Sequence, residues 1–417
     1  MSVVSAIRYV ACAIALSSVA LFALASEAPP AAGQANFVQN GDAGFVVTQF
    51  DYALSRDAKE TGACPKGMTK GRKLDELFAG VPGAAGANTA ATQQGQAAQS
   101  REAQAAASRV VAQVLADGRN ACMNPAAAGP DPNFRTVEAP NISAYGIDLD
   151  GQDSRANGRP AAGTCAHDDF RGFNGERGID NQFFRVVGCS AFLQPEHSDV
   201  ITTEMLTGAW GILIRLRGVH DIRNDDNVEV GFYASADPIQ LGPTRQPLTY
   251  ATYAMTQNPR FRATTRGRIV NGVLTTDPVD VRFWKTVNGI YLERPLRDAR
   301  VRMTLSPQGV LDGYLAGYTP VEDMYNLQYG YRNGVDGNGK PVPEQQLVFT
   351  AVGSSLISGH TCNGAYHALV AAADGHRDPA TGRCTSISTQ YRVRAIPAFV
   401  VDVEPQGSNA ALYKKPN

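Results

Sequence analysis

Regular alternation of apolar and polar residues in the middle of the chain is the feature that most constrains its fold. The stretches 212–217, 228–233 and 299–305 each place apolar side chains at every second position. A period of two with one polar face predicts half-buried antiparallel strands. Asn-Gly pairs at 271–272 and 288–289 lie between such stretches, and this pair is a strong signal for a type I′ hairpin turn. We therefore expect a mainly β protein built as an antiparallel, jelly-roll-like β-sandwich.

The rest of the chain predicts helical additions to this sandwich. Valine and leucine repeat four residues apart between 110 and 115, and 345–375 also has a helical pattern, which predicts a helical C-terminal flank. An Ala/Gly/Gln-rich tract at 79–99 has almost no large apolar side chains and predicts a loose loop. The expected organisation is a signal peptide at 1–25, an N-terminal helical and loop segment at 26–129, a β-sandwich domain at 130–403 and a tail at 404–417.

The start of the chain has the pattern of a secretory signal peptide. Arg8 supplies the positive charge, residues 9–24 form an uncharged and mostly apolar run, and 23–25 has the small-x-small pattern of a cleavage site. The run is short for a membrane span, so we expect cleavage before Ser26 and no transmembrane segment afterwards. An uncleaved anchor is the alternative. Cys12 would be removed with the signal peptide.

Six cysteines remain in the expected mature chain, and they predict disulfide bonds. An even number of cysteines in an exported protein indicates an oxidising compartment, here the periplasm, the cell surface or the medium of a bacterium. Their spacing predicts three local pairs: Cys64–Cys122, Cys165–Cys189 and Cys362–Cys384. No Cys-x-x-Cys-His motif is present, so we expect no haem.

The charge balance and the absent motifs exclude several classes of partner. The formal net charge is −1, which gives no reason to expect nucleic acid as a partner. The sequence has no phosphate-binding glycine loop, so we expect no nucleotide. The candidate partners are a small molecule, a glycan or another protein of the cell envelope.

An acidic, glycine-rich loop is the best candidate for a metal site. Asp148, Asp150 and Asp153 alternate along it, and Asp180 follows in the same segment. Calcium takes six to eight oxygen ligands, and carboxylates at alternating loop positions can converge on one point. The spacing departs from that of an EF-hand. We expect these four residues to bind calcium, with capping of turns by their side chains as the alternative.

A second group of residues is the candidate for catalysis. His220 and Asp225 lie in a charged loop between two expected strands, and Asp168 with Asp169 lies in the acidic segment. A histidine beside carboxylates can act as general acid and base. A solvated charged turn is the alternative for the loop.

Tyrosines after the last expected hairpin are the candidates for ligand binding. Tyr314, Tyr318 and Tyr325 could stack on a sugar or another ring. They could equally cover the edge of the core with their hydroxyls in water.

Several blocks of the sequence resemble a family of exported bacterial proteins over about residues 140–400. The blocks are GIDLDG, TCAHDDF, RGIDNQFFRVVGC, RNDDNVEV, TRGRIVNGVL, RDARVRMTLSPQGVLDGYLAGY and DPATGRCTSIS. That family is uncharacterised, so the resemblance implies no catalytic residue and no ligand. The strand pattern is also similar to that of concanavalin-like and jelly-roll sandwiches, which often bind carbohydrate.

The function expected from the sequence is binding without catalysis. The chain would be an exported protein that binds a small molecule, a glycan or an envelope partner, with calcium ordering the acidic loop. The alternative is a hydrolase that uses carboxylates and a histidine in a cleft at the edge of the sandwich. A purely structural role in the envelope is a third reading.

Overall fold

The computed structural model describes residues 37–54, 62–71, 113–115, 117–138, 142–154, 159–193, 200–207 and 210–403. The predicted signal peptide, the loop at 79–99, the C-terminal tail and most of the predicted N-terminal helix lie outside these residues. Within the described ranges, no helix is long and apolar enough to cross a membrane.

The protein is mainly β, as the alternation predicted. The strands are β1 Asp42–Tyr52, β2 Ile212–Arg217, β3 Asn224–Ala234, β4 Thr252–Ala254, β5 Arg262–Val270, β6 Val273–Thr276, β7 Val279–Val287, β8 Ile290–Leu305, β9 Leu311–Pro320, β10 Gly375–Arg377 and β11 Cys384–Val401. They form one sheet, in which every pairing is antiparallel except the one between β4 and β11.

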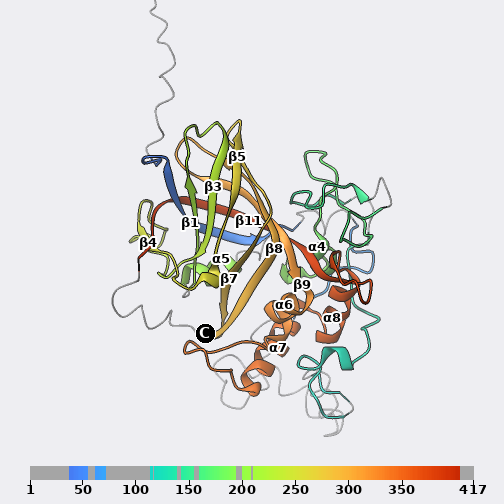
Figure 1. Ribbon diagram of the computed structural model, residues 1–417. Helices are drawn as coiled ribbons and strands as arrows, with labels where there is room; N and C mark the ends of the chain where they lie inside the picture. Colours follow the sequence, from blue (N-terminus) through green and yellow to red (C-terminus); the bar gives the residue numbers. More distant parts are fainter. Residues whose placement is uncertain are drawn as a thin grey trace, which may run out of the picture. The chain divides into compact units, whose positions relative to one another are not determined.

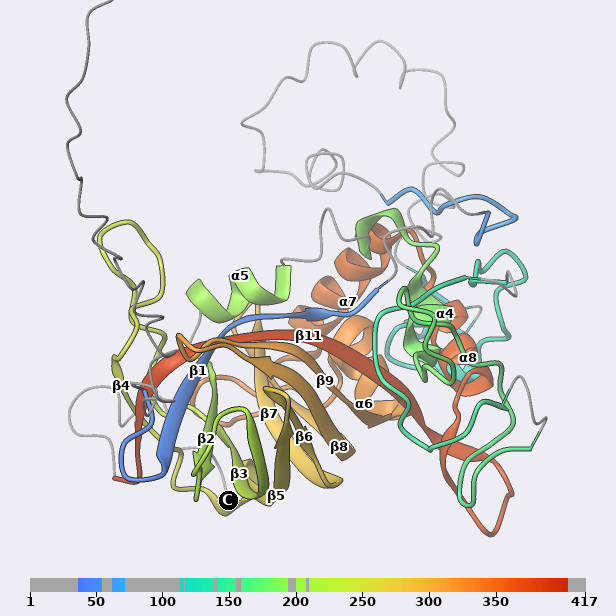
Figure 2. The ribbon, with the colours of Figure 1, turned by 90° about the horizontal axis from the view of Figure 1, so that it is seen from above.

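The sheet returns on itself. Its strand order is β1-β2-β3-β5-β6-β8-β9-β11-β10, and β1 also pairs with β11, so the path from β1 closes at β11 (Figure 2). Two halves of one continuous sheet therefore face each other across a shared apolar core, which is a sandwich-like arrangement.

The hairpins at both Asn-Gly pairs are confirmed. Asn271 and Gly272 connect β5 to β6, Asn288 and Gly289 connect β7 to β8, and all four have positive φ, as a type I′ turn requires.

Strand β1 corrects the predicted domain boundary. It lies inside the expected N-terminal segment 26–129, yet it pairs with β2 on one side and β11 on the other. Its apolar side chains, among them Phe45 and Phe50, are completely buried. The sheet therefore begins at residue 42 rather than after residue 130, because closing it requires a strand between β2 and β11.

The predicted C-terminal helices are confirmed. In the described residues the helices are α4 Gln182–Val187, α5 Val200–Thr207, α6 Val321–Tyr325, α7 Glu344–Ser358 and α8 Cys362–Ala371, with a π-helix at Asn326–Gly330 and short 3₁₀ turns at Pro125–Ala127, Ala191–Leu193 and Pro259–Phe261. Helices α4, α6 and α8 contact β11, and α5 packs on β1 (Figure 1).

The six cysteines form three disulfides, but none of the predicted local pairs is correct. The bonds are Cys64–Cys189, Cys122–Cys362 and Cys165–Cys384. Each joins residues at least 125 positions apart in the sequence. The chain brings distant segments together around β11 and the C-terminal helices, so sequence spacing does not determine the pairing. Three formed disulfides indicate a compartment outside the reducing cytoplasm.

Strand β11 positions the acidic segment. Along its first half, Ile387, Thr389 and Tyr391 alternate with Ser388 and Gln390, and all five are buried. The side chain of Gln390 donates to the carbonyl oxygens of Ile147 and Asp180, at 2.9 and 2.6 Å. The Ser388 hydroxyl accepts from the N–H of Gln182 at 2.9 Å. One face of β11 thus builds the core, and its other, polar face holds the acidic segment.

Candidate metal centre

A two-stranded contact brings the two ends of the acidic segment together. Phe170 and Ile179 exchange backbone hydrogen bonds, both at 3.0 Å, and both side chains are buried. This contact places His167 and Asp169, just before Phe170, next to Asp180, just after Ile179. The disulfide of Cys165 then ties the same turn to the start of β11.

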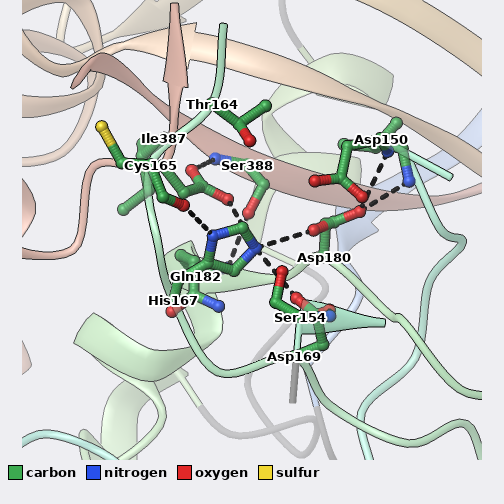
Figure 3. A network of polar contacts seen from close by, with 12 residues as sticks. Asp150, Ser154, Thr164, Cys165, His167, Asp169, Asp180, Gln182, Ile387 and Ser388 are labelled. Carbon is green, nitrogen blue, oxygen red and sulfur yellow. Dashed lines mark hydrogen bonds and ion pairs between the residues drawn. The ribbon is translucent and has the colours of Figure 1, made fainter. Parts of the chain in front are cut away.

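Four aspartates around His167 share one arrangement, in which one carboxylate oxygen accepts a backbone N–H and the other is turned toward the imidazole; Figure 3 labels Asp150, Asp169 and Asp180. The anchoring bonds run from Leu149 N to Asp180 Oδ2 at 2.6 Å, from Ser154 N to Asp169 Oδ2 at 2.6 Å, from Ser388 N to Asp374 Oδ1 at 2.7 Å and from Gln152 N to Asp150 Oδ1 at 2.8 Å. The second oxygens of Asp150 and Asp374 are buried without a hydrogen-bond partner. The backbone therefore fixes four carboxylates around one imidazole.

The imidazole of His167 lies among these carboxylates. Its Nε2 is 3.0 Å from Asp180 Oδ1, 2.8 Å from Asp169 Oδ1 and 3.8 Å from Asp374 Oδ2. The contact with Asp180 has hydrogen-bond geometry, whereas the oxygen of Asp169 is closer but lies off the N–H direction. On the other side of the ring, Nδ1 is 2.6 Å from the carbonyl oxygen of Cys165. A carbonyl only accepts, so Nδ1 carries a proton.

The electrostatics of the centre follow from burial and from an excess of acids. Burial opposes protonation of His167, but contacts with Asp169 and Asp180 outweigh it and raise the pKa to about 11. Burial raises the pKa of Asp180 to about 7 and that of Asp374 to about 6. Without a bound cation the centre therefore retains protons that exposed carboxyls would have lost at neutral pH.

The donor set fits a divalent metal ion. Ligand atoms of Asp150, His167 and Asp180 all lie within 4.8 Å of one another. A histidine whose Nδ1–H is held by a carbonyl presents Nε2 as a ligand, the usual arrangement in metal proteins. Calcium prefers oxygen ligands only, whereas imidazole suits zinc and other first-row transition metals. A nitrogen at the middle of the cluster therefore favours a transition metal over the calcium expected from the sequence.

Two of the four predicted calcium ligands lie in this cluster and two lie beside it. Asp150 and Asp180 belong to it. Asp148 is half-buried, accepts from the N–H of Gly151 at 2.6 Å and has a pKa raised to about 6, first by burial and then by Asp150 and Asp169. Asp153 forms an ion pair with Arg177 at 2.5 Å, so its carboxylate is already neutralised.

The predicted catalytic residues do not form one site. His220 is exposed in the turn between β2 and β3, and its ion pair within the described part of the chain is with Asp225, at the start of β3, at 3.5 Å. The carboxylate of Asp225 accepts from the N–H groups of its own loop, as in the alternative of a charged turn. Asp168 is exposed, while Asp169 lies in the metal centre. None of the contacts of His220 or Asp225 includes either of these aspartates.

The predicted tyrosine surface is largely buried. Tyr325 is completely buried, and its hydroxyl donates to the carbonyl oxygen of Cys122 at 2.9 Å. Tyr318 is 5% exposed and packs with Tyr314 against Ile147 and Leu149. These side chains cover the core, so they do not offer an open aromatic face.

Sequence reasoning missed His167 as a ligand and missed Asp374 entirely. His167 stands between a cysteine and two aspartates in TCAHDDF, and this signal could have been found. Asp374 is about 200 residues away and has no acidic neighbour in the sequence. Its place in the centre depends on the pairing of β10 with β11.

No protein-family model, curated protein or solved structure matches this chain. The resemblance to exported bacterial proteins stays a prediction.

Proposed function

We propose that this chain is an exported, non-catalytic binding protein whose buried centre around His167 holds one divalent transition-metal ion. The observation that carries this proposal is the orientation of the imidazole. Nδ1 carries the proton that is donated to the Cys165 carbonyl. Nε2, which faces two carboxylate oxygens, therefore either carries a second proton, in an imidazolium, or offers its lone pair to a metal. A single N–H cannot serve both oxygens, whereas a cation between them would bind all three atoms.

The unpartnered oxygens of Asp150 and Asp374 support the same conclusion. A buried carboxylate oxygen without a partner lowers the free energy of unfolding by about 1–3 kcal/mol, and by more when the group is charged. Four aspartates around one histidine leave negative charge in excess even when the imidazole is protonated. A divalent cation would reduce this excess and give a partner to Asp150, which lies in the same cluster as His167 and Asp180.

The burial of the centre supports a structural role for the ion. Asp180 and Asp374 are completely buried, Asp169 is 1% exposed, and the His167 side chain is 7% exposed. Catalytic metal sites keep an open position for water or substrate, and structural sites are closed by protein ligands. The ion would fasten the acidic segment to β10 and β11, next to the disulfide of Cys165. The binding partner remains a small molecule, a glycan or an envelope protein, and the compartment the periplasm or the cell surface.

Metal analysis and unfolding of the purified, disulfide-bonded protein test the proposal. We expect elemental analysis to find about one transition-metal ion per chain. Removal of that ion should lower the thermal midpoint, and zinc or manganese should restore it more effectively than calcium. Unchanged midpoints after exhaustive chelation, with no metal in the native protein, would contradict the proposal.

A matched pair of histidine variants separates the centre from general effects. His167→Gln keeps a polar side chain but removes the nitrogen ligand, so we expect about 100-fold weaker metal binding. His220→Gln changes an exposed histidine on the other loop and should bind the metal as the native protein does. Equal metal affinities of the two variants would refute the role of His167. A thermal midpoint that only calcium restores would instead support the calcium site expected from the sequence.

A further inference from the structure

Arg294 is a buried cation inside the apolar core. It occupies an inward position on β8, in line with Leu292 and Leu296, and is 1% exposed. The guanidinium stays protonated in proteins, so a full positive charge lies where the neighbouring positions carry leucine. Such a charge is costly unless an opposite charge or a set of hydrogen bonds compensates it.

Only one of the three guanidinium nitrogens of Arg294 has hydrogen-bond partners. Nη1 donates to the hydroxyls of Tyr52 and Tyr391, at 3.1 and 3.0 Å. The Tyr52 hydroxyl is neutral, since burial raises its pKa far above its usual range. The guanidinium carbon lies 5.4–5.7 Å from the ring centres of Tyr391, Tyr52 and Phe50. The surroundings are therefore aromatic, and among the described residues no carboxylate pairs with this arginine.

The two nitrogens without a partner lie on one edge of the guanidinium. Nε and Nη2 of Arg294 are both buried and form no hydrogen bond. These two N–H groups point the same way and form the side-on fork that matches a carboxylate. Arg215 and Arg260 use this same pair of nitrogens to hold the carboxylates of Asp42 and Glu293. In Arg294 the fork has the same donors but no acceptor from the described chain.

A second cation adds to the positive charge of this region. Lys285, on β7, is buried, and its Nζ donates to the carbonyl oxygen of Leu327 at 3.2 Å. Its only described acidic neighbour is Glu204, at 3.9 Å. Arg294 and Lys285 thus add two basic groups to this region, and Glu204 is the only described acid paired with either of them, although burial lowers the pKa of Lys285.

We propose that the Nε–Nη2 edge of Arg294 binds the carboxylate of a small organic acid with a flat or apolar body. The carboxylate would complete the fork, and the stacked rings of Phe50, Tyr52 and Tyr391 would contact the body of the ligand. An inorganic oxyanion would meet the fork as well, but it has no apolar body to match the aromatic surroundings. This site is separate from the metal centre and does not depend on it.

Matched acids and neutral analogues test the proposal on the native protein. The probes are benzoate and octanoate, with benzamide and octanol as neutral partners and inorganic phosphate as a third arm. We expect at least one acid to raise the thermal midpoint and to bind about 100-fold more tightly than its neutral partner. Equal binding of acid and neutral analogue, or binding of phosphate alone, would overturn the proposal. So would the absence of binding by both acids, if denaturation of the purified protein also releases no carboxylic acid.

Variants then assign the binding to the arginine. Arg294→Met fills a similar volume without the charge, and we expect at least about 100-fold weaker binding of the acid. Arg260→Met removes the same fork from an exposed ion pair and should leave acid binding unchanged. If Arg294→Met does not fold, the comparison of acid with neutral analogue on the native protein still decides the proposal. Unchanged acid binding by a folded Arg294→Met would assign the acid to another site.

Discussion

The two buried polar regions of this protein carry opposite excess charge. Around His167 the carboxylates outnumber the cation, whereas Arg294 has no described acidic partner and the neighbouring Lys285 has one, Glu204. On the surface the chain pairs its charges, as in Asp42 with Arg215 and Glu293 with Arg260. Burial makes the difference informative. An exposed charge is solvated by water and screened by salt, while a buried charge without a partner needs a ligand of opposite sign. The comparison therefore supports the proposed cation in one region and the proposed anion in the other.

The largest expected effect comes from the disulfide beside the metal centre. Replacing Cys165 and Cys384 by serine should cost about 4 kcal/mol of unfolding free energy, because it frees a long loop in the unfolded chain. It should also weaken metal binding, since the disulfide holds in place the segment whose backbone carbonyl, at residue 165, orients His167. Urea unfolding and metal titration measure both effects.

The disulfide between Cys64 and Cys189 is the matched control. Its removal should cost stability without changing metal affinity, because neither cysteine contacts a residue of the centre. An equal loss of metal affinity in both variants would mean that the effect is general.

The pH dependence of the metal-free protein is the next largest effect. The folded pKa values of Asp180 and Asp374, about 7 and 6, exceed their unfolded values near 3.9, so the folded state binds more protons between about pH 4 and 7. Stability therefore falls as pH rises through this window. The raised pKa of His167 acts in the same direction, since its stabilisation is complete below about pH 6.5 and is lost toward pH 11.

We expect the metal-free protein to lose several kcal/mol of unfolding free energy between pH 5 and pH 8. Urea unfolding at the two pH values measures it. The metal-loaded protein should show the opposite trend, because acid protonates its ligands. Greater stability of the metal-free protein at pH 8 would contradict the excess of buried carboxylates.

A smaller effect should change sign with the metal. Asp374→Asn keeps the oxygen that accepts from Ser388 and removes one buried charge. We expect the metal-free variant to be more stable than the native protein by about 1–2 kcal/mol and the metal-loaded variant to be less stable. Thermal unfolding with and without metal measures both, with the exposed Asp226→Asn as control. A loss of stability in both states would assign Asp374 an ordinary structural role.

The smallest effect is expected at the loop that the sequence first suggested for catalysis. His220→Ala should change the unfolding free energy by less than about 0.5 kcal/mol, because the side chain is exposed and its ion pair with Asp225 is on the surface. Chemical denaturation measures it. A change of several kcal/mol in the unfolding free energy would show that His220 contributes to stability as a buried charged residue does.

Local chemistry made much of the sheet predictable from the sequence. The alternation in β2, β3 and β8 and the Asn-Gly turns depend on neighbouring residues, because side chains in a strand point to alternate faces and Asn-Gly accepts positive φ. Asp150 and Asp180 could be proposed as ligands for the same reason, since they lie in one acidic segment. The imidazole of His167 was present in that segment too, but its neighbours did not reveal which way Nε2 points.

The sequence by itself determined the strand pattern, the hairpins, the C-terminal helices and the presence of disulfides, because each depends on residue type and near neighbours. Only the tertiary structure decided the closure of the sheet by β1, the three disulfide pairs, the position of Asp374 beside His167 and the burial of Arg294. These features join residues far apart in the sequence. Their partners are selected by packing in three dimensions, where burial rather than spacing determines which charges must be matched.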